Sequence, residues 1–254
     1  MHALSNQEIQ SRAPSIFASE ASGRVSERFR FVNSGDAIEA LAQGGYGVVS
    51  AVQVNTRTRD PRYVRHTFDV QPLDYFNKDC VVGELIPRVK IANAHDGSSS
   101  WMVYAAFFRL VCLNGAVAAF SDFESIRIPH SSKQLDNVLE GVFKVIEVSN
   151  RAAQACMDWT GTRLSRDAKE EFAERALALR WPANPPVTAG QLLVPRLETD
   201  AHNTLFHNYQ VIQRALTQGL ATGTRRRAPR LQELNAIKLN QNLFRLAESY
   251  AAKA

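Results

Sequence analysis

Residues 87–115, with the sequence PRVKIANAHDGSSSWMVYAAFFRLVCLNG, decide the fold prediction. An apolar strand is predicted over 87–92, followed by a polar loop and then by an apolar stretch over 101–113. The stretch offers no polar face to water, which is typical of a helix in the middle of a domain. Because a bilayer-spanning helix needs about 20 apolar residues, this shorter stretch indicates a buried central helix.

The ends of the predicted helix carry residues that suit helix termini. Ser98 to Ser100 are good N-cap residues, and Asn114 and Gly115 can adopt the left-handed conformation that closes a helix. Arg109 is the one charge within it, and a buried charge needs a partner. We favour a structural ion pair over a bound phosphate. The candidate carboxylates are those of Glu84, Asp96, Asp122 and Glu124.

The rest of the chain divides into an extended half and a helical half. Strands are predicted over 46–54, 63–70, 81–85, 87–92, 116–120 and 124–128, the first two as an antiparallel hairpin. Helices are predicted over 36–43, 133–159, 165–180, 199–218 and 231–252. The expected fold is α+β: an antiparallel sheet with a buried central helix, followed by a helical C-terminal half.

Three regions are expected along the chain. Residues 1–25 are small and polar and are predicted to form a flexible N-terminal arm. Residues 26–160 form the α+β core domain, and residues 161–254 form a helical region with a basic loop at 219–230. Glycines and a proline in that loop favour a break between helices.

Composition points to a globular protein of the cytoplasm. The chain has 254 residues, of which 45% are hydrophobic, enough for a large core. The first residues lack the apolar run of a secretory signal, and no segment suits a membrane span, so no membrane partner is expected. Its 3 cysteines lie far apart, which favours neither a disulfide framework nor a zinc site.

Two basic clusters stand out within a formal net charge of +5. Guanidinium groups pair with phosphate oxygens, and an aromatic ring among them can stack a base, the two ingredients of single-strand binding. For the second cluster, a solvated linker whose arginines meet acidic groups of the same protein is the alternative. The candidate nucleic-acid-binding residues are Arg57, Arg59, Arg62, Tyr63, Arg65 and His66 in the first cluster, and Arg225, Arg226, Arg227 and Arg230 in the second.

Several blocks of the sequence resemble a known family. They are NAHDGSSSW at 93–101, FFRLVCLNG at 107–115, LLVPRLETD at 192–200 and IKLNQNLFRLAE at 237–248. Together with Arg65, His66 and Phe68 of the hairpin, they are similar to the hallmark blocks of the domain of unknown function 932 family, the phage/plasmid-like proteins. The resemblance implies residence on phages, plasmids or integrated elements in a bacterial host, and it implies no established activity.

The loop before the predicted helix is a candidate anion site. Its residues would meet a helix N-terminus, where backbone N–H groups and the helix dipole favour a phosphate. The alternative is that Asp96 and Ser98 only cap the helix and that His95 is a structural turn residue, because no P-loop pattern is present. The candidate anion ligands are Asn93, His95, Asp96, Ser98 and Arg109.

Catalysis is not indicated by any motif. An alternative interpretation takes His66, His95 and Asp96 as ligands of a divalent metal for phosphodiester hydrolysis, but their spacing is not diagnostic. Cys112 lies in the apolar stretch and is a poor nucleophile there. We therefore name no catalytic residue, no metal ligand and no cofactor.

The functional expectation is a nucleic-acid-binding protein of a mobile element, acting on single-stranded DNA in recombination or replication. The order of elements, an antiparallel meander followed by a helix, is similar to the core of phage single-strand annealing proteins, which assemble into oligomers. A homo-oligomer is thus a further expectation. The alternatives are a metal-dependent nuclease and a host-interaction protein that blocks a defence system.

Overall fold

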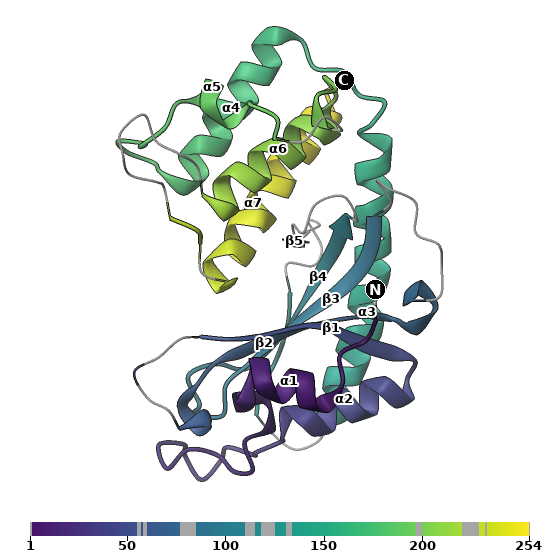
Figure 1. Cartoon of the computed structure of the whole chain (residues 1–254), viewed down its shortest axis with the longest axis vertical. Helices are drawn as coiled ribbons and strands as arrows, with labels where there is room; N and C mark the ends of the chain where they lie inside the picture. Colours follow the sequence, from purple (N-terminus) through teal and green to yellow (C-terminus); the bar gives the residue numbers. More distant parts are fainter. Residues whose placement is uncertain are drawn as a thin grey trace. The chain divides into compact units, whose positions relative to one another are not determined.

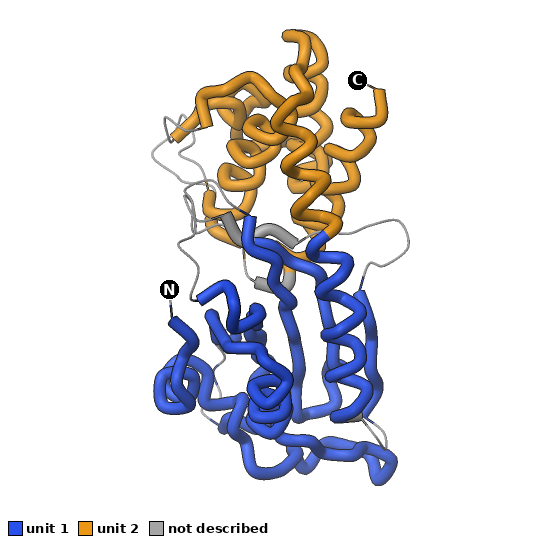
Figure 2. Tube along the Cα trace, turned by 90° about the vertical axis from the view of Figure 1, so that its right-hand side faces the viewer, with its two compact units in different colours: residues 1–113, 123–150 blue, residues 114–122, 151–254 orange. Residues whose placement is uncertain are grey.

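A computed structural model of the chain describes most of its residues. The described ranges are 2–54, 57, 60–76, 85–109, 115–117, 125–130, 134–196, 200–219, 229–231 and 233–253. The chain divides into two compact units, shown in Figure 2: residues 1–113 with 123–150, and residues 114–122 with 151–254. The second boundary falls within a helix, ten residues before the position 160 that the sequence favoured.

An antiparallel sheet forms the centre of the first unit. Its strands are β1 (Tyr46–Gln53), β2 (His66–Pro72), β3 (Leu85–Asn93), β4 (Trp101–Arg109) and β6 (Ile126–Ile128). They pair in the order β1-β2-β3-β4, and β6 also pairs with β4. The predicted α+β class with an antiparallel sheet is confirmed.

The central helix predicted over 101–113 is wrong, because residues 101–109 form strand β4. This strand pairs with β3 from Leu85 opposite Arg109 to Ala92 opposite Met102. The side chains on the inner face of β4 are buried, whereas Met102 and Tyr104 on the other face are half-buried. Apolar residues on both faces conceal the two-residue period of a strand, and the same composition suits a buried helix.

Two helices belong with this sheet, α2 (Ser34–Gln43) and α3 (Gln134–Asp158). A Cβ added at Gly141 of α3 would lie 3.3 Å from the side chain of Ile128 and 3.6 Å from that of Val103. Helix α3 therefore packs closely on the apolar face of the sheet, behind β3 and β4 in Figure 1. Ser149 of the same helix donates to Arg88 O of β3 (2.8 Å).

The N-terminal residues are folded, so the flexible arm predicted over 1–25 is wrong. Helix α1 (Asn6–Arg12) begins with a capping box between Ser5 and Glu8. The 3-10 helix η1 (Pro14–Phe17) follows it. Ile9 and Ile16 are 1% and 0% exposed, respectively, so this segment supplies part of the core. Because most residues of this segment are small or polar, its few buried apolar residues were not recognised from composition.

The second unit is helical, as predicted for the C-terminal half. It contains α4 (Arg166–Arg180), α5 (Ala189–Leu192), α6 (Leu205–Gln218), α7 (Glu233–Ala251) and the short β5 (Gly115–Val117). Its core includes Trp159, whose ring centroid lies 5.6 Å from that of Tyr209 and 4.9 Å from that of Phe244. Within the described ranges, no helix is long and apolar enough to cross a membrane.

Candidate functional site

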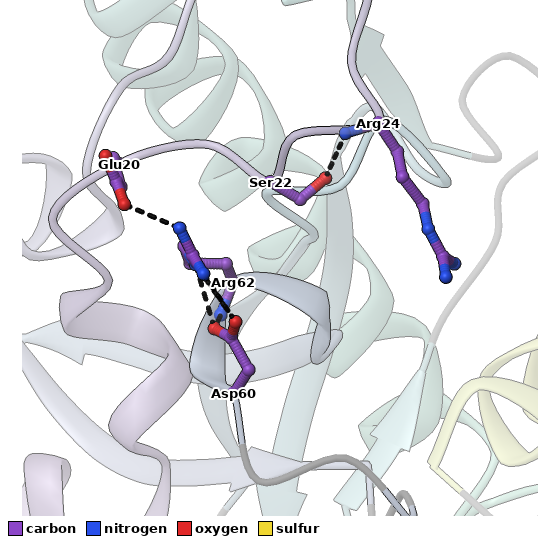
Figure 3. Close-up of polar contacts among 5 residues, drawn as sticks. All are labelled: Glu20, Ser22, Arg24, Asp60 and Arg62. Atoms are coloured by element: carbon purple, nitrogen blue, oxygen red, sulfur yellow. Dashed lines mark hydrogen bonds and ion pairs between the residues drawn. The ribbon is translucent and has the colours of Figure 1, made fainter.

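The hairpin arginine Arg62 is neutralised within the protein. Its Nη1 lies 2.6 Å from Glu20 Oε1, its Nη2 lies 2.7 Å from Asp60 Oδ2, and its Nε donates to Asp60 Oδ1 at 3.0 Å (Figure 3). Hydrogen bonds from Arg62 lower the pKa of the Asp60 carboxyl, and the same pair raises the pKa of Arg62. Two carboxylates therefore compete with any external phosphate for this guanidinium.

Tyr63, the predicted stacking residue, is also engaged. The guanidinium carbon of Arg24 lies 5.1 Å from the centre of the Tyr63 ring, and that of Arg62 lies 6.0 Å from it. The segment that carries Arg24 is held by a bond from its backbone N to Ser22 Oγ (3.3 Å), drawn in Figure 3. A base would have to displace a guanidinium to stack on Tyr63.

Arg65 differs from Arg62 in its partners. Its Nη2 donates to the backbone oxygen of Ser98 at 3.1 Å and lies 3.5 Å from Ser98 Oγ. Both acceptors are neutral. A contact between the hairpin and the 93–98 loop is thus made by Arg65 and Ser98.

A second arginine meets the same turn from β6. Arg127, which the sequence analysis missed, donates from Nε to Ser100 Oγ at 3.0 Å and is exposed. The isoleucines on either side of it in the predicted strand were a usable signal, because strand alternation places Arg127 on the face opposite to them.

Strand register adds an aromatic residue to this face. Arg127 is opposite Met102 of β4, and Tyr104 follows two positions later, so the three side chains lie on one face of the sheet. Arg65 lies close enough to lower the pKa of Tyr104, although burial dominates and raises it. We call the set formed by Arg65, Ser98, Ser100, Met102, Tyr104 and Arg127 the Arg65/Arg127 surface.

Acidic groups near this surface are few among the residues described. No described carboxylate forms an ion pair with Arg65 or Arg127. Asp96 lies in the same turn, where its Oδ1 accepts the backbone N–H of Ser98 at 2.9 Å. Arg65 and Arg127 are therefore not paired with a carboxylate among the described residues, and Asp96 lies in the adjoining turn.

A buried polar cluster lies on the opposite face of the same strand ends. Ser34 Oγ, at the start of α2, lies 2.8 Å from His66 Nε2 and accepts a hydrogen bond from Asn93 Nδ2 at 3.0 Å. The ring of His95 lies 5.1 Å from that of His66. All four side chains are 0% exposed. We call Ser34, His66, Asn93 and His95 the histidine cluster.

Both histidines of this cluster are neutral at physiological pH. Burial, with a smaller contribution from the neighbouring His95, lowers the pKa of His66 to about 3. Burial likewise lowers the pKa of His95 to about 4, with an added contribution from His130. Because Ser34 Oγ already accepts the Asn93 N–H, its own proton is free to bond His66 Nε2. The cluster is a neutral hydrogen-bonded link between α2, β2 and β3.

Comparison with known proteins identifies the family of this chain. The family described as "Domain of unknown function (DUF932)" matches residues 21–241. The chain belongs to the DUF932 family. It is similar to the UPF0380 proteins YfjQ and YafZ of Escherichia coli (strain K12), each 30% identical over 253 residues, with 97% of this chain and 91% of each relative covered. No solved structure gives a significant match.

In this DUF932 chain, the predicted anion ligands separate into two groups. Ser98 and Asp96 lie in the turn beside Arg65, whereas Asn93 and His95 are buried in the histidine cluster. The helix N-terminus predicted at this loop is wrong, because the turn leads into strand β4. His66, predicted to bind nucleic acid, is also buried. Strand alternation is the reason: Arg65 and His66 are neighbours that face opposite ways.

Some predicted residues of the DUF932 chain lie elsewhere or outside the description. Arg57 and Arg230 are exposed. Arg59, Arg225, Arg226, Arg227 and the side chain of Arg109 lie outside the described residues, although the Arg109 backbone ends β4. The structure describes no group of three or more His, Cys, Asp or Glu side chains placed to hold a metal ion.

Proposed function

We propose that this protein binds nucleic acid and that the Arg65/Arg127 surface contacts the phosphate backbone. One observation supports the proposal above others: both guanidiniums are held by neutral serine oxygens of one turn. An arginine positioned in this way keeps its full charge for a ligand. Arg62 does not meet this condition, because its charge is already paired with two carboxylates of the protein.

The hydrogen-bonding capacity of the two arginines fits phosphate. Arg65 uses Nη2 toward Ser98, and Arg127 uses Nε toward Ser100. A guanidinium has five N–H donors in a planar fork that matches phosphate oxygens bidentately. Because the serine contacts limit the freedom of each side chain, less conformational entropy is lost when a phosphate binds.

The overall charge supports the same ligand class. The chain carries a formal net charge of +5 and has a pI near 9.3, which favours attraction to a polyanion. Recombination or replication of the DNA of a mobile element, with a homo-oligomer as the acting form, is the setting we propose for this binding.

Binding of a fluorescently labelled oligonucleotide at low salt tests the proposal. The double variant Arg65→Gln with Arg127→Gln is expected to bind about 100-fold more weakly, since a hydrogen bond to a charged group contributes about 1.5 to 3 kcal/mol. The matched control is Arg62→Gln, which removes a guanidinium that is already neutralised and is expected to bind like the wild type. Equal loss in both variants would contradict the proposal.

A further inference from the structure

We infer that the ligand of the Arg65/Arg127 surface is single-stranded and that Tyr104 stacks one of its bases. This inference rests on the proposed function and names the form of nucleic acid that the surface accepts. It is carried by the position of one half-buried aromatic ring on the same face as two arginines.

The register of the sheet fixes where Tyr104 lies. Tyr104 is opposite Lys90 of β3, and Lys90 is opposite Asp69 of β2. Directly opposite residues of antiparallel strands share a face. Trp101 and Val103, which alternate with Met102 and Tyr104, are 0% exposed on the other face. The Tyr104 side chain is therefore directed away from the apolar core below α3.

Charges around Tyr104 favour an anionic ligand with an uncharged base. Lys90 Nζ lies 2.6 Å from Asp69 Oδ1, so the carboxylate closest to Tyr104 in the strand register is paired with a cation. Burial raises the pKa of Tyr104, which keeps the phenol neutral. Arg65 and Arg127 are then the charges that meet a backbone passing this ring.

The combination selects a single strand. In a duplex the flat faces of the bases are stacked on one another, and a protein surface meets phosphates and base edges. In a single strand the bases are free to stack on aromatic rings while arginines follow the backbone. Tyr63 is less suited to this role, because Arg24 already lies over its ring.

The test compares probes of equal length, of which the two single strands also carry equal backbone charge. Wild-type protein is titrated with oligo(dT), with a base-free deoxyribose phosphate strand, and with a duplex. Oligo(dT) is expected to bind about tenfold more tightly than the base-free strand, the contribution of one stacked base. An oligo(rU) arm, read in the same way, distinguishes RNA from DNA as the source of the strand.

Variants of Tyr104 assign the base preference to this residue. Tyr104→Leu is expected to bind oligo(dT) and the base-free strand equally, whereas Tyr104→Phe keeps the wild-type preference because it keeps the ring. A thermal melt of each variant shows that the fold is retained. If Tyr104→Leu does not fold, the base preference is measured with the same probes on the wild type and on Tyr104→Phe.

Two results would overturn the inference while leaving the proposed function intact. One is equal binding of oligo(dT) and the base-free strand by the wild type. The other is an unchanged base preference in a folded Tyr104→Leu. Failure of the proposed function is distinct, because the wild type would then bind none of the probes at low salt.

Discussion

The two faces at the end of strands β2, β3 and β4 differ in how they treat polar groups. On the outer face, Arg65 and Arg127 keep their charges and bond to neutral serine oxygens. On the inner face, burial lowers the pKa values of His66 and His95 so far that both side chains are neutral at physiological pH. The consecutive residues Arg65 and His66 therefore lie on opposite faces and in opposite environments.

This difference shows that residues of one short motif can have separate roles. In the function that we propose, the outer face offers charge to a ligand. The inner face uses hydrogen bonds to hold α2 against β2 and β3. Changes on the inner face are therefore expected to alter stability, and changes on the outer face are expected to alter binding.

Acid should act on the inner face first. The folded-state pKa values of His66 and His95, about 3 and about 4, lie below the usual value of 6.5, so the unfolded chain binds more protons as the pH falls. Stability is thus full above the unfolded pKa and is lost as the pH falls toward the folded values. We expect a loss of about 2 kcal/mol for each histidine at about pH 5.

Denaturant unfolding at neutral and acidic pH measures this loss. A His66→Gln variant provides the control, since it removes one of the titrating groups and should flatten the dependence of the unfolding free energy on pH. A wild type whose unfolding free energy is the same at both pH values would show that the histidines are not held neutral.

Removing the central hydroxyl of the histidine cluster should also destabilise the protein. Ser34→Ala leaves Asn93 Nδ2 and His66 Nε2 without the oxygen they share. We expect the free energy of unfolding to fall by about 1 to 3 kcal/mol, the cost of leaving buried polar groups unsatisfied. Chemical denaturation measures the change.

If the two faces have separate roles, Ser34→Ala should change stability without changing binding. Oligonucleotide binding by the folded fraction of Ser34→Ala should stay close to that of the wild type at low temperature. A variant that is as stable as the wild type but binds more weakly would instead assign the hydroxyl to the ligand site.

Asp96 offers a smaller change of opposite sign on the outer face. Asp96→Asn keeps the Oδ1 acceptor for the Ser98 N–H and removes the negative charge beside the two arginines. We expect affinity for an oligonucleotide to rise about two- to threefold, in keeping with the modest strength of surface charge interactions. Weaker binding by a variant with an unchanged melting temperature would place Asp96 among the ligand contacts.

The sequence predicted the class of fold and several of the elements, but not the strand that decides the sheet. The stretch over 101–109 carries apolar residues on both faces, so its periodicity could not distinguish a buried strand from a buried helix. The helical half was easier to predict, because amphipathic helices such as α3 show their period along the chain.

The site was harder to predict than the fold, because its contacts join distant parts of the chain. Arg62 is neutralised by Glu20, 42 residues earlier, and His95 lies near Ser34, 61 residues earlier. Neither partner is visible from local composition. Arg65 and Ser98 were both selected from the sequence, but Arg127 came to light only through the pairing of β6 with β4.

The salt dependence of single-stranded oligonucleotide binding tests the central claim most directly. Each phosphate contact contributes about 0.7 to the slope of log affinity against log salt concentration. We predict that Arg65→Gln with Arg127→Gln lowers the magnitude of this slope by about 1.4, whereas Arg62→Gln leaves it unchanged. An unchanged slope in the double variant would contradict phosphate binding by the Arg65/Arg127 surface.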